Sequence, residues 1–212
     1  THRGTLFPYT TLFRSYEFNR GEILVDGRDI KEYSMNELRN KIGLVLQDPF
    51  LYHGTIESNI KMYNKSLTES DIKAAAEFVD ADEFIMQLPE KYKSTVTERG
   101  STFSSGQRQL LTFARTIAAQ PKILILDEAT ANIDSETEEI IQNSLKKMRQ
   151  GRTTIAIAHR LSTIQDANCI YVLDKGEIIE SGTHTKLLQQ KGTYYKMYQL
   201  QAGMLNVEKT YN

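Results

Sequence analysis

The chain has 212 residues, 40% hydrophobic and 25% charged, which is the balance of an ordinary globular protein with one substantial core. Its net charge of −1 gives no basic field for nucleic acid or an anionic membrane, and its single cysteine, Cys169, excludes an internal disulfide. No apolar run approaches the ~18 residues of a membrane span. We therefore expect a soluble chain in a reducing cytoplasm, with no nucleic-acid partner.

Residues 1–15, THRGTLFPYTTLFRS, follow neither the period of a strand nor that of a helix, and Pro8 interrupts them. Beyond this segment the pattern becomes regular. The sequence GEILVDGRDI, residues 21–30, predicts a β-hairpin because two short apolar runs flank an Asp-Gly turn signal. The first regular element is therefore an antiparallel β part.

A short helix and a buried strand come next. Ser34 and Glu37 form the capping-box pattern that opens a helix. The apolar run IGLVLQ then predicts a strand that ends at Gln47. Residues 55–94 are predicted to be mainly helical, with Thr68 as a helix cap. We expect a helical subdomain over about 55–120, inserted between two sheet-forming parts.

The second half of the chain alternates helix and strand. We predict helices at about 105–119, 135–149, 183–190 and 193–201, and strands at 123–126, 154–158, 169–173 and 177–180. Strands separated by helices of about 10–15 residues pair in parallel through crossovers. The fold class is therefore α/β, a layered parallel sheet with an inserted α-helical subdomain and an N-terminal antiparallel β part. Cys169 falls in a predicted strand and is expected in the core.

Two adjacent carboxylates, Asp127 and Glu128, directly follow the apolar strand at 123–126. Burying one ionised carboxylate is costly and placing two side by side costs more, so something must offset their charge. A divalent cation would do so, because hard cations bind oxygen ligands. Asp127 would then lie on the metal side, and Glu128 would orient or deprotonate a water that attacks a phosphate.

Other polar groups fall at the same edge of the predicted sheet, where ligands of open α/β folds bind. Gln47 ends one strand and can reach a metal or a water without adding charge. His159 follows the strand at 154–158 and can hold the same water or the γ-phosphate. The Ser-Ser-Gly turn at 104–106 opens a helix, so its N–H groups and hydroxyls predict a phosphate site. One nucleotide–magnesium complex would offset all of these polar groups.

Each of these residues also has a purely structural interpretation. A strand that ends in Asp-Glu is often the cap of the next helix, and a Ser-Ser-Gly turn is more often a plain cap than an anion site. His159 can be a hydrogen-bonded structural residue, and Gln47 can belong to the turn before Pro49. The order and spacing of all the motifs together favour the nucleotide site.

That order resembles the nucleotide-binding domain of ABC transporters, most closely the exporter type, from Tyr16 to about Gly203. LVLQDPFLYHGTIESNI is similar to the Q-loop region, with Gln47 as its glutamine. FSSGQRQLLTFAR is similar to the family signature, whose five positions are filled by Phe103, Ser104, Ser105, Gly106 and Gln107.

Three further motifs carry the same resemblance. ILILDEAT resembles the Walker B motif, which implies Asp127 as the magnesium-side aspartate and Glu128 as the catalytic base. ANID is similar to the D-loop, ending at Asp134, and IAHRLSTI to the H-loop, with His159 as its switch histidine. VTERG is similar to the loop that touches the transmembrane domain in exporters.

The resemblance implies a P-loop NTPase-like fold and ATP hydrolysis that drives export of a substrate the sequence does not identify. ATP and Mg²⁺ would be the cofactors, with Gln47 reaching the metal indirectly or through water. Such domains work in pairs facing head to tail, so a second ABC ATPase domain and a transmembrane domain would be partners, at the cytoplasmic face of the cell membrane. The implied nucleotide-binding residues are Gln47, Ser104, Ser105, Gly106, Gln107 and Asp134.

Two departures from the family pattern matter. Ser105 stands where the family usually has glycine, although its backbone N–H is retained. More severely, the P-loop should lie just before residue 16, yet residues 1–15 contain no Gly-Lys-Ser/Thr and no lysine. We interpret residues 1–15 as foreign or corrupted sequence that replaces the Walker A region, with a divergent genuine N-terminus as the alternative. The domain would then span 16–203, followed by a tail at 204–212.

Two other functions stay open. A soluble ABC ATPase of the DNA-repair or ribosome-associated kind would be expected to carry coiled-coil insertions or a second cassette with a charged linker, and the sequence shows neither. A non-catalytic interaction module would bind a partner without turning over ATP. The missing P-loop favours that module, whereas Glu128 and His159 argue against it.

Overall fold

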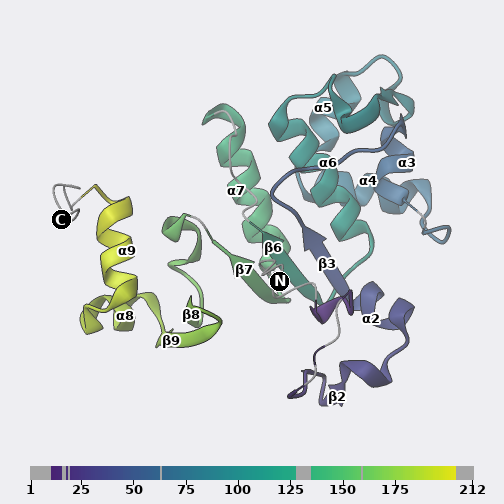
Figure 1. The fold of residues 1–212 in the computed structure, drawn as a ribbon. Helices are drawn as coiled ribbons and strands as arrows, with labels where there is room; N and C mark the ends of the chain where they lie inside the picture. Colours follow the sequence, from purple (N-terminus) through teal and green to yellow (C-terminus); the bar gives the residue numbers. More distant parts are fainter. Residues whose placement is uncertain are drawn as a thin grey trace. The chain divides into compact units, whose positions relative to one another are not determined.

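The computed structural model describes residues 11–15, 18, 20–62, 64–127, 135–158 and 160–203 (Figure 1). The chain forms two compact units, Thr1–Ile155 and Ala156–Asn212. The boundary between them falls inside strand β7 (Thr153–Ile157). Within the described part of the chain, every helix is too short or too polar to cross a membrane.

A three-stranded sheet, in the order β3-β6-β7, forms the centre of the first unit. β3 (Ile42–Val45) pairs in parallel with β6 (Ile123–Asp127), in a register that aligns Val45 with Leu126. β6 lies between two neighbours, and its Leu124 is 0% exposed. A parallel strand that is enclosed in this way is typical of α/β proteins, so the predicted fold class is confirmed.

β3 is shorter than the sequence predicts. It ends at Val45, and the chain bends at Gln47 and Asp48. Pro49, which has no N–H to give to a ladder, follows directly. The prediction that the strand ends at Gln47 was therefore wrong by two residues, and Gln47 lies in the bend beyond the strand.

The predicted hairpin near the N-terminal side is present. β1 (Leu24–Val25) and β2 (Arg28–Asp29) pair antiparallel. Asp26 and Gly27 join them with φ angles of 52° and 76°. A two-residue hairpin turn needs this left-handed conformation at both positions, which is why Asp-Gly is such a strong turn signal.

Two helix caps also agree with the sequence. Ser34 Oγ accepts the N–H of Glu37 at 3.2 Å and so caps α2 (Met35–Lys41). Thr68 caps α4 (Glu69–Phe78) through a complete capping box. Each cap satisfies an N–H group in the first helical turn that has no partner within the helix.

A mainly helical region lies between β3 and β6 in the chain, and Figure 1 shows α3, α4, α5 and α6 grouped together. β4 and β5 form a short antiparallel pair within it. The predicted limits of a helical subdomain, about 55–120, stay a prediction. The remaining elements of the region are β4 (Gly54–Thr55), α3 (Ile56–Lys61), α5 (Asp82–Gln87), η2 (Lys91–Lys93), β5 (Thr95–Val96), η3 (Glu98–Gly100) and α6 (Ser105–Ala118).

Helix α7 (Ser135–Arg149) has the predicted bounds and packs against this helical region. Ser144 Oγ donates to the carbonyl oxygen of Val79 at 2.9 Å. Lys147 Nζ lies 2.7 Å from a carboxylate oxygen of Asp80. These bonds fasten the C-terminal half of α7 to the end of α4.

The second unit contains a hairpin and two helices. A small core holds it together, made of Leu161, Ile170, Val172, Leu187 and Tyr194. Its elements are η4 (Leu161–Ile164), β8 (Ile170–Asp174), β9 (Glu177–Gly182), α8 (His184–Gln190) and α9 (Thr193–Gln201).

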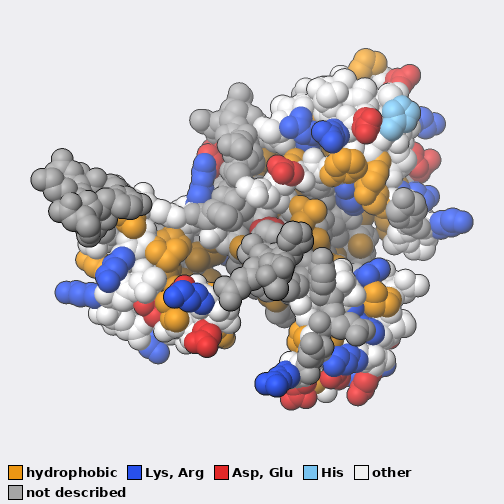
Figure 2. Space-filling view, viewed as in Figure 1, with side chains coloured by type: hydrophobic (Ala, Val, Ile, Leu, Met, Phe, Trp, Pro, Cys, Tyr) orange, Lys and Arg blue, Asp and Glu red, His pale blue; other side chains and the backbone are white. Residues whose placement is uncertain are grey.

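The β8–β9 hairpin is apolar on both faces. Ile170 and Val172 point to the core, whereas Tyr171, Leu173 and Ile178 are 57%, 58% and 60% exposed. Figure 2 shows apolar side chains at the surface of this unit. Cys169 is exposed as well, so the prediction that it lies in the core was wrong. β8 begins one residue later than predicted, and Cys169 precedes its first core residue.

Little of the N-terminal segment is described. Leu12 and Phe13 pack against the apolar cluster that contains the hairpin, and Arg14 Nη1 donates to the carbonyl oxygen of Tyr33 at 3.0 Å. The foreign origin of residues 1–15 stays a prediction. The predicted tail, 204–212, lies outside the described residues.

Candidate functional site

The turn that opens α6 is the best-defined part of the predicted nucleotide site. Ser104 Oγ accepts the N–H of Gln107 at 3.1 Å. In return, Gln107 Oε1 accepts the N–H of Ser104 at 3.0 Å. The two residues form a complete capping box, so both the sequence-predicted phosphate turn and its structural alternative, a helix cap, are present in one feature.

This cap determines which polar groups of the turn can still bind a ligand. The Ser104 hydroxyl has used an oxygen lone pair, which leaves its O–H as a donor. The Gln107 amide has used its oxygen, which leaves its NH₂ group as a donor. The turn also lies at the positive end of the α6 dipole. Its remaining side-chain groups therefore favour an anion, because they can donate hydrogen bonds more readily than accept them.

Gly106 has a packing role in the same turn. A Cβ atom at this position would lie 2.8 Å from the Cβ atom of Thr137 on α7, and closer still to Thr137 Cγ2. Real side chains do not approach so closely, so α6 and α7 can cross here only because position 106 is glycine. The glycine of the predicted phosphate turn is thus also a helix-packing residue.

Gln47 and Asp127 lie at the same edge of the sheet. Asp127 is the last residue of β6 and is 7% exposed. The parallel register pairs Val45 with Leu126, so the next residues along, Leu46 and Asp127, lie at one level and Gln47 lies one residue beyond. The structure therefore brings these two predicted residues to adjacent strand ends, as the sequence anticipates.

The residues present fit a magnesium ion of the kind that binds nucleotides. Asp127 is acceptor-only when ionised and is almost enclosed, and Gln47 carries a neutral amide oxygen two residues after β3 ends. The described residues include no cluster of three or more His, Cys, Asp and Glu side chains that would hold a metal alone. Mg²⁺ does not need one, because it commonly takes one or two carboxylates plus phosphates and waters.

Three predicted site residues lie outside the described part of the chain. They are Glu128, Asp134 and His159. Their neighbours are placed: Glu128 follows the end of β6, Asp134 precedes α7, and His159 comes two residues after β7 ends at Ile157. The assignments of all three stay predictions.

The sequence patterns do not predict a group of polar residues that bonds to the chain after Gln47. Arg115 on α6 and Asn59 on α3 bond to each other and to the chain just after Gln47. Asn59 is 2% exposed, which is unusual for an amide side chain. A charged residue in the middle of an otherwise apolar helical run, as in LLTFARTIA, was the available signal.

The parallel sheet, with polar residues beyond its strand ends, is typical of α/β proteins in which nucleotides bind beyond the carboxyl ends of parallel strands. A model of the family described as ABC transporter matches residues 7–131. The chain therefore belongs to the ABC transporter family, in its ATP-binding part, and the match begins inside the segment 1–15.

Individual relatives agree with this family. The chain is 70% identical over 205 residues to a Streptococcus pneumoniae protein assigned as the ABC transporter ATP-binding protein exp8, covering 97% of this chain and 35% of that protein. It is 53% identical over 192 residues to the probable multidrug resistance ABC transporter ATP-binding/permease protein YheH of Bacillus subtilis, covering 91% and 28%.

A solved structure of a bacterial Atm1-family ABC exporter with ATP bound is similar in fold. The TM-score is 0.85 and the identity 39%, over 95% of this chain and 35% of that chain. This chain thus spans about a third of the length of these three proteins.

Proposed function

We propose that this chain is the ATP-binding and ATP-hydrolysing domain of an ABC exporter, and that its work drives transport through a membrane domain. The observation that carries the proposal is the turn at Ser104 and Gln107, whose cap leaves an O–H and an NH₂ group as donors and so suits a phosphate. It is supported by the carboxylate at the end of β6 and by relatives named as exporters or multidrug transporters. The substrate that is exported is not identified by any residue of this chain.

In this proposal each predicted residue has one task. Asp127 holds the magnesium side of the nucleotide, and Gln47 contacts the metal or its water. Glu128 receives the proton of the water whose oxygen forms the new bond to the γ-phosphorus, while the bond to the β–γ bridging oxygen breaks. His159 orients that water or the γ-phosphate. Mg²⁺, when bound, neutralises charge on the phosphate oxygens.

The turn that opens α6 would serve the nucleotide of a second domain. Two such domains face head to tail, so Ser104, Ser105, Gly106 and Gln107 approach the partner's γ-phosphate, and Asp134 lies at the contact between domains. The partner would be an identical or related ABC ATPase domain. The pair would work at the cytoplasmic face of the cell membrane, attached to a transmembrane domain.

Replacing Glu128 by glutamine in a full-length exporter that carries this domain tests the proposal. Loss of a general base typically lowers a rate by about 10²–10⁴. We expect ATP hydrolysis to fall by that much while ATP remains bound, because glutamine keeps the size and most of the polarity of the side chain. Steady-state turnover close to that of the unaltered exporter would exclude Glu128 as the base.

A second candidate function applies to the chain as it stands. Residues 1–15 have no lysine to neutralise the β- and γ-phosphates, and Pro8 lacks an N–H where a phosphate loop needs consecutive donors. We therefore propose that this chain acts as an interaction module that binds ATP weakly or not at all. Calorimetric titration with Mg-ATP tests this, and a dissociation constant in the low micromolar range would contradict it.

A further inference from the structure

The strip Phe50–Tyr52, which begins three residues after Gln47, is held by side chains although it belongs to no strand. Tyr52 donates its N–H to Asn59 Oδ1 and accepts from Asn59 Nδ2, both at 2.8 Å. Asn59 Nδ2 also donates to the carbonyl oxygen of Thr55 at 3.0 Å. One buried amide thus replaces the ladder that a neighbouring strand would have provided.

Arg115 on α6 holds the other end of the strip. Its Nη1 donates to the carbonyl oxygen of Phe50 at 2.8 Å. Its Nε and Nη2 donate to the backbone oxygen and to Oδ1 of Asn59, at 2.8 and 2.9 Å. The guanidinium also lies 5.6 Å from the centre of the Tyr52 ring. With the Tyr52 N–H, both acceptor positions of Asn59 Oδ1 are then filled.

The strip has a third attachment, at the turn that precedes α6. The carbonyl oxygen of Leu51 accepts the N–H of Arg99 at 3.1 Å. Leu51 is 0% exposed, and a Cβ atom at Gly100 would lie 2.7 Å from its Cδ1 atom. The φ of Gly100 is +63°, so glycine suits this position for its conformation as well as for its size.

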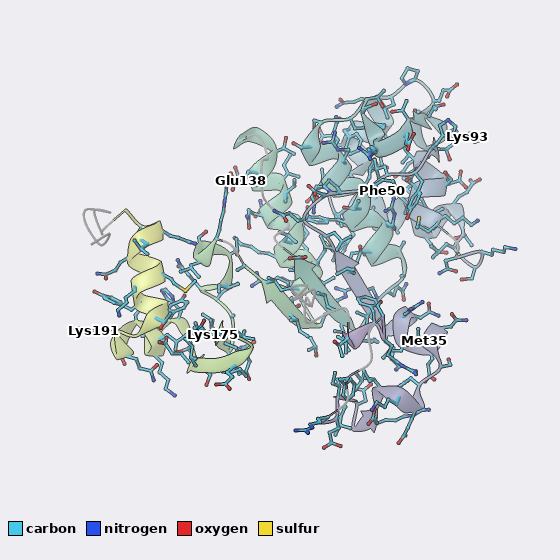
Figure 3. All side chains as sticks on the ribbon, viewed as in Figure 1. Met35, Phe50, Lys93, Glu138, Lys175 and Lys191 are labelled. Atoms are coloured by element: carbon cyan, nitrogen blue, oxygen red, sulfur yellow. The ribbon has the colours of Figure 1, made fainter. Side chains whose placement is uncertain are left out.

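The side chains of Phe50 and Tyr52 point outward from this fixed backbone. Their rings make an edge-to-face pair with centroids 4.9 Å apart, and they are 43% and 46% exposed. Figure 3 labels Phe50 beside the α3–α6 group, and Figure 2 shows apolar side chains on the same face. The strip is therefore anchored by its backbone and not by burial of its two aromatic rings.

We propose that Arg115 and Asn59 are positioning residues that tie the segment carrying Gln47 to α6, whose first turn is the Ser104–Gln107 phosphate turn. Arg115 is eleven residues after Ser104 in the same helix, so the two ends of α6 move together. The single proton of the Thr116 hydroxyl lies between the carbonyl oxygens of Thr112, at 2.9 Å, and of Leu44 on β3, at 3.3 Å, so Arg115 and Asn59 make the main connection. The inference rests on the proposed function for the roles of Gln47 and Ser104.

The choice of arginine supports a positioning role. All three oxygens that Arg115 contacts in this network are uncharged, and burial lowers the pKa of its guanidinium from the usual value. A buried cation with only neutral acceptors is costly compared with an apolar side chain of similar length. What arginine adds is a rigid planar fork that reaches three oxygens at once, which lysine cannot do.

Amide hydrogen exchange on the whole chain tests the tie directly. The reporters are the N–H groups of Tyr52 and Arg99, which bond to Asn59 and to Leu51. We expect Arg115→Met to speed exchange at both about tenfold, because the strip opens locally. Arg115→Lys should stay close to Arg115→Met. Arg115→Lys also carries the test if the methionine variant does not fold.

Arg152→Met is the matched control, because Arg152 also donates to backbone oxygens of the first unit, at Pro121 and Met148. It should leave the two reporters unchanged. Unchanged exchange at both reporters in Arg115→Met would overturn the inference. So would an equal rise at the amides of β3 and β6, because that would mean a general loss of stability, or full recovery with lysine.

The rate of ATP hydrolysis distinguishes a failure of this inference from a failure of the proposed function. In a full-length exporter that carries this domain, Arg115→Met should lower kcat about 10–100-fold, with KM for ATP within about twofold, because the catalytic groups remain but are misplaced. Unaltered kcat would overturn the positioning role. If the unaltered exporter hydrolyses no ATP, the proposed function fails, and hydrogen exchange still decides whether the tie exists.

Discussion

Helices α6 and α9 meet the same electrostatic need at their first turns in opposite ways. α9 has Gly192 as its N-cap residue, without a capping side chain, and the carboxylate of Glu180 on β9 accepts the N–H groups of Thr193 and Tyr194. The second unit therefore supplies an anion of its own, the Glu180 carboxylate, at the start of α9. α6 is capped by the neutral groups of Ser104 and Gln107.

The difference separates a structural helix start from one suited to a ligand. Both turns have N–H groups without partners inside the helix and a positive dipole end. At α9 an internal carboxylate satisfies these groups, and a Cβ atom at Gly192 would collide with it. At α6 the cap leaves the side chains as donors. A negative charge of the protein therefore occupies the start of α9, whereas the capping side chains of α6 are neutral.

The largest expected effect comes from placing a negative charge at the start of α6, as Glu180 does at the start of α9. Gln107→Glu keeps an oxygen for the Ser104 N–H but replaces the outward NH₂ by a negative charge. A like charge against the partner's phosphate costs several kcal/mol, so ATP-driven pairing of intact domains should weaken about 100-fold or more. Sedimentation of the intact domain with ATP measures it.

The same variant has an opposite effect on folding, which serves as its control. Glutamate is favourable at this position of a capping box and at a helix start, so Gln107→Glu should keep the stability of the chain or raise it by about 0.3–1 kcal/mol. Normal pairing on ATP would show that the α6 turn is a plain cap.

Gly106→Ala tests the packing side of the same turn. The added methyl group has no room against Thr137, so we expect a loss of about 1–3 kcal/mol of unfolding free energy. Thr137→Gly removes the obstructing atoms, at about 0.3 kcal/mol of helix propensity by itself, because threonine is also a poor helix former. Denaturant unfolding of the single and double variants should show a favourable coupling between them. Strict additivity would mean that the two residues do not limit the helix crossing.

Glu180→Gln removes the negative charge at the start of α9. Glutamine can still accept one of the two N–H groups, but it lacks the charge, so we expect a loss of about 0.5–1 kcal/mol from the second unit. Hydrogen exchange at the Thr193 and Tyr194 amides measures it locally. Faster exchange in α6 rather than in α9 would contradict the contact.

The pH dependence of α9 should be the smallest effect. The bond from the Tyr194 N–H, and then those from Thr193, lower the pKa of Glu180 from its usual value. A carboxyl group with a lowered folded-state pKa stabilises the fold above its unfolded pKa, about 4.3, and this contribution is lost as the pH falls through the folded-state value. The protection of the α9 amides, taken relative to the intrinsic exchange rate at each pH, should therefore fall in that acidic range, and Glu180→Gln should remove the fall.

Local patterns predicted much of this fold. The bounds of α7, the Asp-Gly hairpin and the Thr68 cap follow from signals within a few residues, and all three are present. The end of β3 was placed too late, because the apolar pattern continues through Leu46 while the chain already bends ahead of Pro49. Cys169 was placed in the core, but the alternation of buried Ile170 and Val172 with exposed Tyr171 puts position 169 on the exposed face.

Contacts between distant parts of the chain could not be predicted from the sequence. Gly106 was predicted as a phosphate-turn glycine. That a larger residue there would collide with Thr137 is visible only where α6 and α7 cross. Arg115 and Asn59 are 56 residues apart, and no local period links them. The candidate site could be predicted at strand ends because that rule concerns topology, whereas Arg115 and Asn59 depend on packing that only the folded chain reveals.

The exposed face of the β8–β9 hairpin has a consequence for how the chain behaves when it is concentrated. Tyr171, Leu173 and Ile178 form an apolar patch on a two-stranded sheet, the kind of edge that other chains can extend into aggregates. A register shift between Val172 and Leu173 and the charges of Asp174, Lys175 and Glu177 at the turn counteract this. The hairpin is thus the part of the chain where a single added lysine should most improve solubility.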